Sequence, residues 1–126
     1  MSECDYGYES VSTVYVGFDN AVTVVPYSDI TARTVYDMST VTEVTASVDL
    51  STSVTTGDDI TASSNDNPTT IWWDQTDGEW RIHFKIGLFV GIVAGTYDLR
   101  IVIIDTAHPN GLVLTDSVPV VVVGAP

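Results

Sequence analysis

Cysteine and basic residues are scarce in this chain of 126 residues, and each shortage excludes a class of structure or partner. Cys4 is the single cysteine, so an internal disulfide is impossible. Only 4 Lys and Arg stand against 17 Asp and Glu, which gives a formal net charge of −13. Nucleic-acid binding needs cations that replace the counterions on phosphates, and an anionic membrane repels an acidic surface. We therefore expect no nucleic-acid partner and no membrane partner.

Targeting and glycosylation signals are also missing. The opening "MSECDYGYES" has neither the basic region nor the apolar region of a secretory signal. The most apolar run, "IGLFVGIVAGTY", is too short to span a bilayer and contains three glycines. Pro68 follows Asn67 and blocks the one near-match to an N-glycosylation acceptor. These absences predict a soluble protein that is made in the cytoplasm.

No residue pattern predicts catalysis, a cofactor or a metal. Nucleophilic catalysis needs a base beside the nucleophile, and the two histidines lie in the polar phase of a strand (His83) and in a turn (His108). We interpret both as ordinary surface residues. Carboxylates at positions 58, 59, 66, 74 and 77 could offer oxygens to calcium, but they lack the spacing of an EF-hand loop. We interpret them as solvated turn residues and expect a protein that is not an enzyme.

What the sequence has in abundance is strand-forming residues. Hydrophobic residues make up 44% of the chain, and most are Val and Ile, with many Thr beside them. β-Branched side chains fit a pleated sheet and crowd a helix. Alternation is clearest after Asp77-Gly78, a hairpin signal, where Trp80, Ile82 and Phe84 share one face. We predict strands at residues 11–17, 21–27, 41–50, near 60, at 70–74, 79–86, 96–105, 112–116 and 117–123.

This spacing predicts one all-β domain, an antiparallel β-sandwich over residues 11–126. Residues 28–40 show no clear pattern. Residues 1–10 are polar with no apolar period, and we interpret them as an extended N-terminal arm whose order comes from a partner. Tyr6 and Tyr8 are its expected anchors, because tyrosine offers contact area at low entropic cost.

The second half resembles an immunoglobulin-like domain. The segments "DGEWRIHFKIG", "AGTYDLRIVIID" and "HPNGLVLTDSVPVVVV" have the layout of its last three strands, and Tyr97 stands where a tyrosine corner belongs. More narrowly, residues 41–123 resemble small proteins encoded among the head and tail genes of tailed bacteriophages. The resemblance implies a virion structural protein, either a capsid decoration (cement) protein or a tail or neck component. The implied partners are the major capsid protein or other virion proteins, and the implied location is the virion.

Two strands carry apolar residues on both faces. Val102 and Ile104 lie opposite the face of Tyr97, and Val121 and Val123 repeat the pattern in the final strand. One face of each strand fills the sandwich, so the other needs a cover. The cover is either residues 28–40 folded across the sheet or another protein chain. We expect these four residues to form a subunit contact of a homo-oligomer on the particle.

The tryptophans raise an alternative from another class. Aromatic faces stack on sugars, so Trp72, Trp73 and Trp80 are compatible with a carbohydrate-binding β-sandwich module. Trp72 and Trp73 are adjacent and point to opposite faces of a strand, so at least one belongs to the core. Trp80 has the phase of Ile82 and Phe84, which also indicates the core. A carbohydrate-binding module would leave an aromatic platform exposed.

Overall fold

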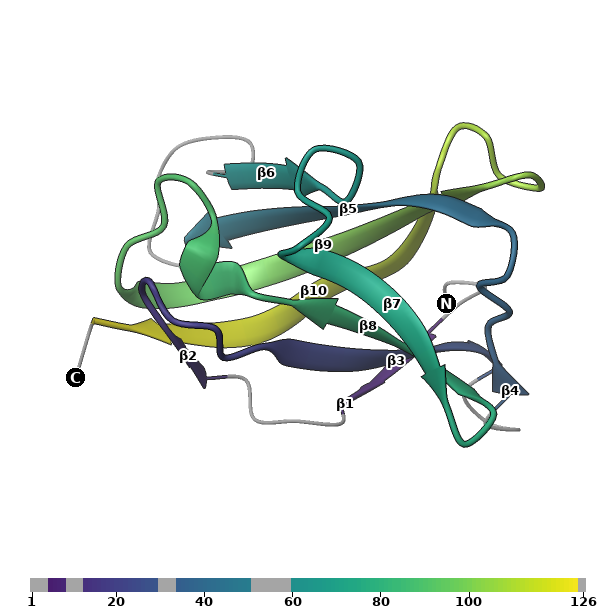
Figure 1. Ribbon diagram of the computed structural model, residues 1–126, viewed down its shortest axis with the longest axis horizontal. Coiled ribbons are helices and arrows are strands. Elements are labelled where there is room, and N and C mark those ends of the chain that lie inside the picture. Colours follow the sequence, from purple (N-terminus) through teal and green to yellow (C-terminus); the bar gives the residue numbers. More distant parts are fainter. Residues whose placement is uncertain (1–4, 9–12, 30–33, 51–59, 125–126) are drawn as a thin grey trace.

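The computed structural model describes residues 5–8, 13–29, 34–50 and 60–124, which form ten strands and one short 3-10 turn (Figure 1). The strands are β1 (Asp5–Tyr8), β2 (Thr13–Tyr15), β3 (Val22–Asp29), β4 (Thr34–Val35), β5 (Val41–Leu50), β6 (Ile60–Ser63), β7 (Ile71–Thr76), β8 (Glu79–Phe84), β9 (Gly95–Asp105) and β10 (Leu112–Val123). The 3-10 turn, η1 (Ile86–Leu88), follows β8. In the described part of the chain, no helix is long and apolar enough to cross a membrane.

The strands pair into two sheets of five. The first has the order β1-β3-β8-β7, with β4 also paired to β3, and the second has the order β2-β10-β9-β5-β6. Read in chain order, these are the A-B-E-D sheet and the G-F-C-C′ sheet of an immunoglobulin-like sandwich. Every pairing is antiparallel except that of β2 with β10, which is parallel. The predicted fold class is confirmed.

The core lies between β8 and β9, as the alternation predicted. Ile82 and Phe84 on β8 are fully buried, and so are the alternate residues of β9: Leu99, Ile101 and Ile103. Tyr97, at the start of β9, is 2% exposed, and Trp80 is partly buried against the same cluster. The hairpin before β8 turns through Asp77 and Gly78 with φ angles of 52° and 77°. Positive φ at both residues is the geometry of a type I′ turn, which matches the twist of the two strands.

A tyrosine corner ties β9 to the loop before it. The Tyr97 hydroxyl donates a hydrogen bond to the carbonyl oxygen of Val93 at 2.9 Å. The ring is buried while its hydroxyl reaches backbone four residues upstream, which is the arrangement of the corresponding tyrosine in immunoglobulin-like domains. The corner fixes the path of the chain from η1 into β9.

Residues 5–8 differ from the expectation for the arm. They are extended, but β1 pairs with β3 in antiparallel register from Asp5 opposite Tyr27 to Tyr8 opposite Val24. Backbone pairing within the chain therefore orders residues 5–8, so for these four residues the expectation that order must come from a partner is wrong. The other residues of the arm lie outside the described part. Alternation of side chains could not reveal the pairing, because an edge strand of four residues can be held by its backbone alone.

Two strand boundaries also differ from the predicted ones. Pro26 lies inside β3 instead of at its end; β8 pairs with Val22 to Val24, and the residues beyond pair with β1 and β4. The two predicted final strands are one strand, β10, whose register against β9 shifts between Val113 and Val118. Such irregularities let one strand continue where its alternation breaks.

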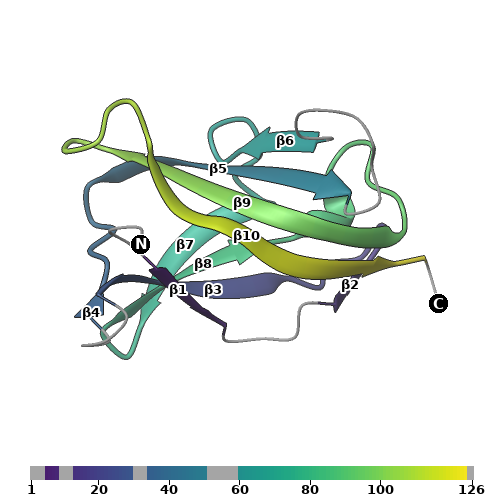
Figure 2. The same cartoon turned by 180° about the vertical axis from the view of Figure 1, so that it is seen from behind.

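The two long-axis ends of the sandwich carry different segments (Figures 1 and 2). One end of the sandwich holds β2, η1 and the last residues of β10. The opposite end holds the β9–β10 turn and the start of β5. Surfaces at the two ends are therefore separate.

Candidate functional site

The four β-strand residues predicted to form one subunit contact lie on one face of the β9–β10 sheet. Val121 and Val123 are 43% and 37% exposed, whereas Val102 and Ile104 are half-buried. Tyr6 and Tyr8 lie in β1, and their side chains are outside the described part of the structure.

These four residues form two groups instead of one patch. Val121 pairs with Thr96 at the start of β9, while Val102 lies six residues further along that strand. Asp98 and Arg100 occupy the outward face of β9 between them, and both are exposed. A single apolar contact through all four would bury this pair of charged side chains.

Part of the cover over Val102 comes from the chain itself. Gly111, in the β9–β10 turn, lies so close that a Cβ atom added there would be 2.9 Å from Val102 Cγ1. Within residues 28–40, β4 joins β3 in the opposite sheet, and Tyr36 after it reaches Asp105 at the end of β9. Val113, which pairs with Val102, remains 42% exposed. The turn thus covers only part of this apolar group.

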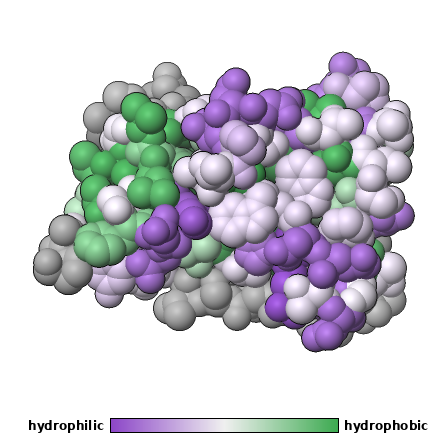
Figure 3. Space-filling model, viewed as in Figure 1, coloured by the Kyte–Doolittle hydropathy of each residue, from purple (hydrophilic) through white to green (hydrophobic). Residues whose placement is uncertain are grey.

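The larger exposed apolar surface lies at the other end of the sandwich, and we call it the apolar end. Val90 is 90% exposed, Val93 58% and Phe18 45%. Figure 3 shows this region as the green area on the side of η1 and the loop that follows it. Its residues come from β2 and the turn after it, from η1 and its loop, and from β10: Tyr15, Phe18, Leu88, Val90, Val93, Val121 and Val123.

Backbone contacts hold the three segments of the apolar end together. Gly17 N–H donates to the Gly87 carbonyl oxygen at 2.7 Å, and Val16 N–H donates to the Val123 carbonyl oxygen at 2.9 Å. The rings of Tyr15 and Phe18 meet edge to face, with centroids 6.4 Å apart. The apolar end is therefore a fixed surface on a hydrogen-bonded frame, which reduces the entropy that a docking partner would have to overcome.

His83 is part of a polar cluster on the outer face of the other sheet. Its ring stacks on Trp72, its cross-strand neighbour, with centroids 5.0 Å apart and planes inclined by 23°. Its Nε2 lies 2.9 Å from Asp74 Oδ1, and its Nδ1 lies 3.0 Å from Thr23 Oγ1. Lys85 Nζ lies 5.3 Å from the centroid of a Trp72 ring. The interpretation of His83 as an ordinary surface residue therefore missed a structural role: it holds Trp72 in place.

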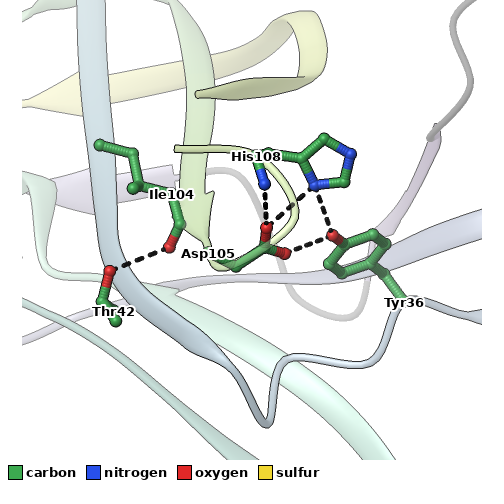
Figure 4. A network of polar contacts seen from close by, with 5 residues as sticks. All are labelled: Tyr36, Thr42, Ile104, Asp105 and His108. Atoms are coloured by element: carbon green, nitrogen blue, oxygen red, sulfur yellow. Dashed lines mark hydrogen bonds and ion pairs between the residues drawn. The ribbon is translucent and has the colours of Figure 1, made fainter. Parts of the chain in front are cut away.

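His108 belongs to a second cluster, around the buried carboxylate of Asp105 (Figure 4). The Tyr36 hydroxyl donates to Asp105 Oδ2 at 2.5 Å, and the backbone N–H of His108 donates to Asp105 Oδ1 at 2.8 Å. His108 Nδ1 lies 2.9 Å from the same Oδ1. The hydrogen bond from Tyr36 lowers the pKa of Asp105 below its ordinary value; burial acts in the opposite direction, and His108 adds to the lowering.

The Asp105 cluster joins parts of the chain that are distant in sequence, and it resembles the aspartate–histidine pair of a hydrolase only in part. A nucleophilic site also needs a hydroxyl or thiol beside the free ring nitrogen of the histidine. The third member here, Tyr36, instead donates its proton to the aspartate. We interpret the cluster as a tie between the residues after β4 and the β9–β10 turn.

The acidic turns do not assemble a metal site in the described part of the chain. No group of three or more His, Cys, Asp or Glu side chains lies close enough there to hold an ion. Asp58 and Asp59 fall outside the described residues. Asp74 instead bonds to His83.

Comparison with known proteins identifies no family for this chain. No family model matches the chain, and no curated protein matches it. Among solved structures, a cohesin module from a family 33 glycoside hydrolase of Clostridium perfringens is similar over 99% of this chain and 100% of that chain, with 10% identity and a TM-score of 0.29. A likeness at that score carries no functional argument, and the immunoglobulin-like assignment rests on the strand order and the tyrosine corner.

Proposed function

We propose that this chain is a non-enzymatic structural protein of a tailed-phage virion, and specifically a capsid decoration protein that docks on the major capsid protein. A tail or neck component is the alternative location within the same class. Sequence layout over residues 41–123 supports the class. A fold alone does not identify a function, so the argument for docking must come from a surface.

The apolar end is the observation that carries the proposal. A monomer in water gains nothing from leaving Val90 90%, Val93 58% and Phe18 45% exposed. Contiguous exposed apolar side chains of this kind mark surfaces that another protein covers. Docking would remove them from water at about 25 cal/mol for each Å² of apolar area.

Charge gives the docking its selectivity. With a formal net charge of −13, free copies repel one another, so uncontrolled association through the apolar end is opposed. A shell protein that offers an apolar socket, with cations at its rim, would overcome that repulsion. Copies would then lie next to one another on the particle because the lattice of the shell protein sets their positions.

Quantitative mass spectrometry of purified virions tests the proposal. We expect hundreds of copies per particle, which is the stoichiometry of a component that follows the shell lattice. A few copies per particle would place the protein in the tail or neck instead. Absence from purified particles would overturn the virion assignment.

A pair of valine variants tests the docking surface. Val90→Asp puts a charge at the apolar end, where the side chain is already in water, so the domain should stay folded. Val113→Asp makes the same change at 42% exposure at the other end of the sandwich. We expect Val90→Asp to abolish attachment to particles and Val113→Asp to retain it. The reverse result would move the contact to the end that carries Val102 and Ile104.

A further inference from the structure

A second surface feature has a chemistry different from that of the apolar end. A groove of about 230 Å³ opens where the two sheets meet at their β6 and β7 edges. Its apolar lining comes from β7 and the loop before it, and its polar lining comes from that loop and the start of β5: Ile71, Trp72, Trp73 and Pro68, with Asn65 and Thr42. The face over β7 is pale in Figure 3, between the hydrophobic and hydrophilic extremes.

The two adjacent indoles have different surroundings. Trp73 packs partly into the core. Trp72 points to the other face of β7, where it stacks on His83 while still lining the groove. His83 is in turn held by Asp74 and Thr23. The Trp72 ring is therefore fixed before any ligand arrives, as a stacking platform must be if it is not to lose rotamer entropy on binding.

The loop between β6 and β7 is equally well fixed. Asn67 N–H donates to the Ser63 carbonyl oxygen at 2.9 Å, and Ile71 N–H donates to the Asn67 carbonyl oxygen at 3.1 Å. Asn65 N–H donates to Ser63 Oγ at 3.1 Å, while the Asn65 side chain is exposed at the groove. The amide of Asn65 can both donate and accept hydrogen bonds. The hydroxyl of Thr42 donates to the Ile104 carbonyl oxygen at 3.3 Å and can still accept.

We propose that this groove binds one ring of a neutral sugar. A pyranose offers an apolar face of C–H groups to an indole and hydroxyls that donate and accept around its edge, which are the two kinds of group that the groove supplies. A volume of about 230 Å³ lies below the roughly 300–1,000 Å³ of pockets for drug-sized ligands, so one ring fits better than an elongated ligand.

Charge selects the class of sugar. Among the described residues no charged side chain lines the groove, and the chain as a whole carries a formal net charge of −13. Acidic sugars would enter a repulsive field, and Lys85, whose Nζ lies 5.3 Å from the centroid of a Trp72 ring, is already paired with Asp19 Oδ1 at 3.3 Å. The site therefore favours neutral hexoses and N-acetylhexosamines. This inference does not depend on where the protein attaches.

NMR titration of the three tryptophan indole N–H signals tests the inference, because Trp80 is an internal reference. Trp80 lies on β8 and does not line the groove. The probes are cellotriose, maltotriose, mannotriose and chitotriose, with trigalacturonate as the acidic control and a proline-rich nonapeptide as the alternative ligand of an aromatic groove. We expect at least one neutral probe to shift the signals of Trp72 and Trp73 with saturation, while the signal of Trp80 stays in place.

Two variants and their controls complete the test. Trp72→Ala should weaken the affinity about tenfold or more, since a large aromatic anchor is lost, whereas Trp80→Phe should leave the affinity unchanged. Asn65→Ala should also weaken binding, and Asn110→Ala, the same change in the exposed β9–β10 turn, should not. Trp72 lies on the outer face of β7, so we expect the Trp72→Ala variant to fold, and its thermal unfolding curve checks this. If that variant is unfolded, the affinity of Asn65→Ala for the sugar decides the test. Absence of a saturable shift with all four neutral probes, equal binding of trigalacturonate, or binding of the peptide alone overturns the inference.

Discussion

Replacement of Tyr36 by Phe should destabilise the protein at neutral pH and much less in acid. Asp105 is 4% exposed, so its charge depends on the hydrogen bonds that it accepts from Tyr36 and His108. A hydrogen bond to a charged group contributes about 1.5–3 kcal/mol, against about 0.5–1.5 kcal/mol for a neutral pair. We therefore expect Tyr36→Phe to lower the free energy of unfolding by about 1.5–3 kcal/mol at pH 7.

The sign of the pH dependence follows from the lowered pKa of Asp105. A carboxyl with a folded-state pKa below its unfolded value of about 3.9 adds stability above that pH and loses it as the pH falls through the folded value. The hydrogen bond from Tyr36 is the largest cause of the lowered pKa, so the difference in free energy of unfolding between wild type and Tyr36→Phe should narrow below about pH 4.

Urea unfolding, followed by tryptophan fluorescence at pH 7, 5, 4 and 3, measures this difference in the free energy of unfolding. Tyr15→Phe removes a hydroxyl from β2, far along the chain from Asp105, and its effect should not vary with pH. If Tyr36→Phe lowered the free energy of unfolding by the same amount at every pH, Asp105 would not be a charged acceptor. If it caused almost no loss at pH 7, the hydrogen bond from Tyr36 to Asp105 would itself be refuted.

Three further substitutions test the fold. Phe84→Ala empties a fully buried position between the sheets and should cost about 3–5 kcal/mol in urea unfolding; a near-neutral result would contradict the core described above. Gly87→Ala would place a Cβ atom 2.0 Å from the Tyr15 carbonyl oxygen, so η1 must move, and we expect a loss of about 1–3 kcal/mol. Gly124→Ala, which meets nothing within 4 Å, is the matched control. Tyr97→Phe removes the hydroxyl that donates to the Val93 carbonyl oxygen and accepts from the Val93 N–H, and it should cost about 0.5–1.5 kcal/mol, with unchanged near-UV circular dichroism.

Alternation of apolar residues predicted the strands that carry the core. A strand that is buried on one face has apolar residues at every second position, so the local sequence is enough to recognise it. The predicted strand at residues 41–50 has the same bounds as β5, and the inward set of β8 and β9 is confirmed. The hairpin at Asp77-Gly78 was predictable for a similar reason, since its two positive φ angles need particular residues.

The polar clusters and the groove could not be predicted in the same way. Tyr36 and Asp105 are 69 positions apart, and the register of β5 against β9 has to be known before they can be placed together. Trp72 and His83 face each other only through the register of one hairpin. The apolar end does have a signal in the sequence, the run "IGLFVGIVAGTY", which is too short to span a membrane. Exposure is set by tertiary packing, so the same run was compatible with a buried loop.

The two proposed surfaces make a joint prediction, because they share no residue. None of the side chains of the apolar end lines the groove, although Val90 lies near Asn67 and Thr70 of the loop between β6 and β7. Docking through the side chains of the apolar end would therefore not use the side chains that line the groove. We expect Trp72→Ala to attach to particles normally and to lose the sugar-dependent shifts, and Val90→Asp to keep those shifts and lose attachment. If either variant lost both properties while its urea unfolding curve matched wild type, the two surfaces would be coupled, and the separation of docking from sugar binding would be wrong.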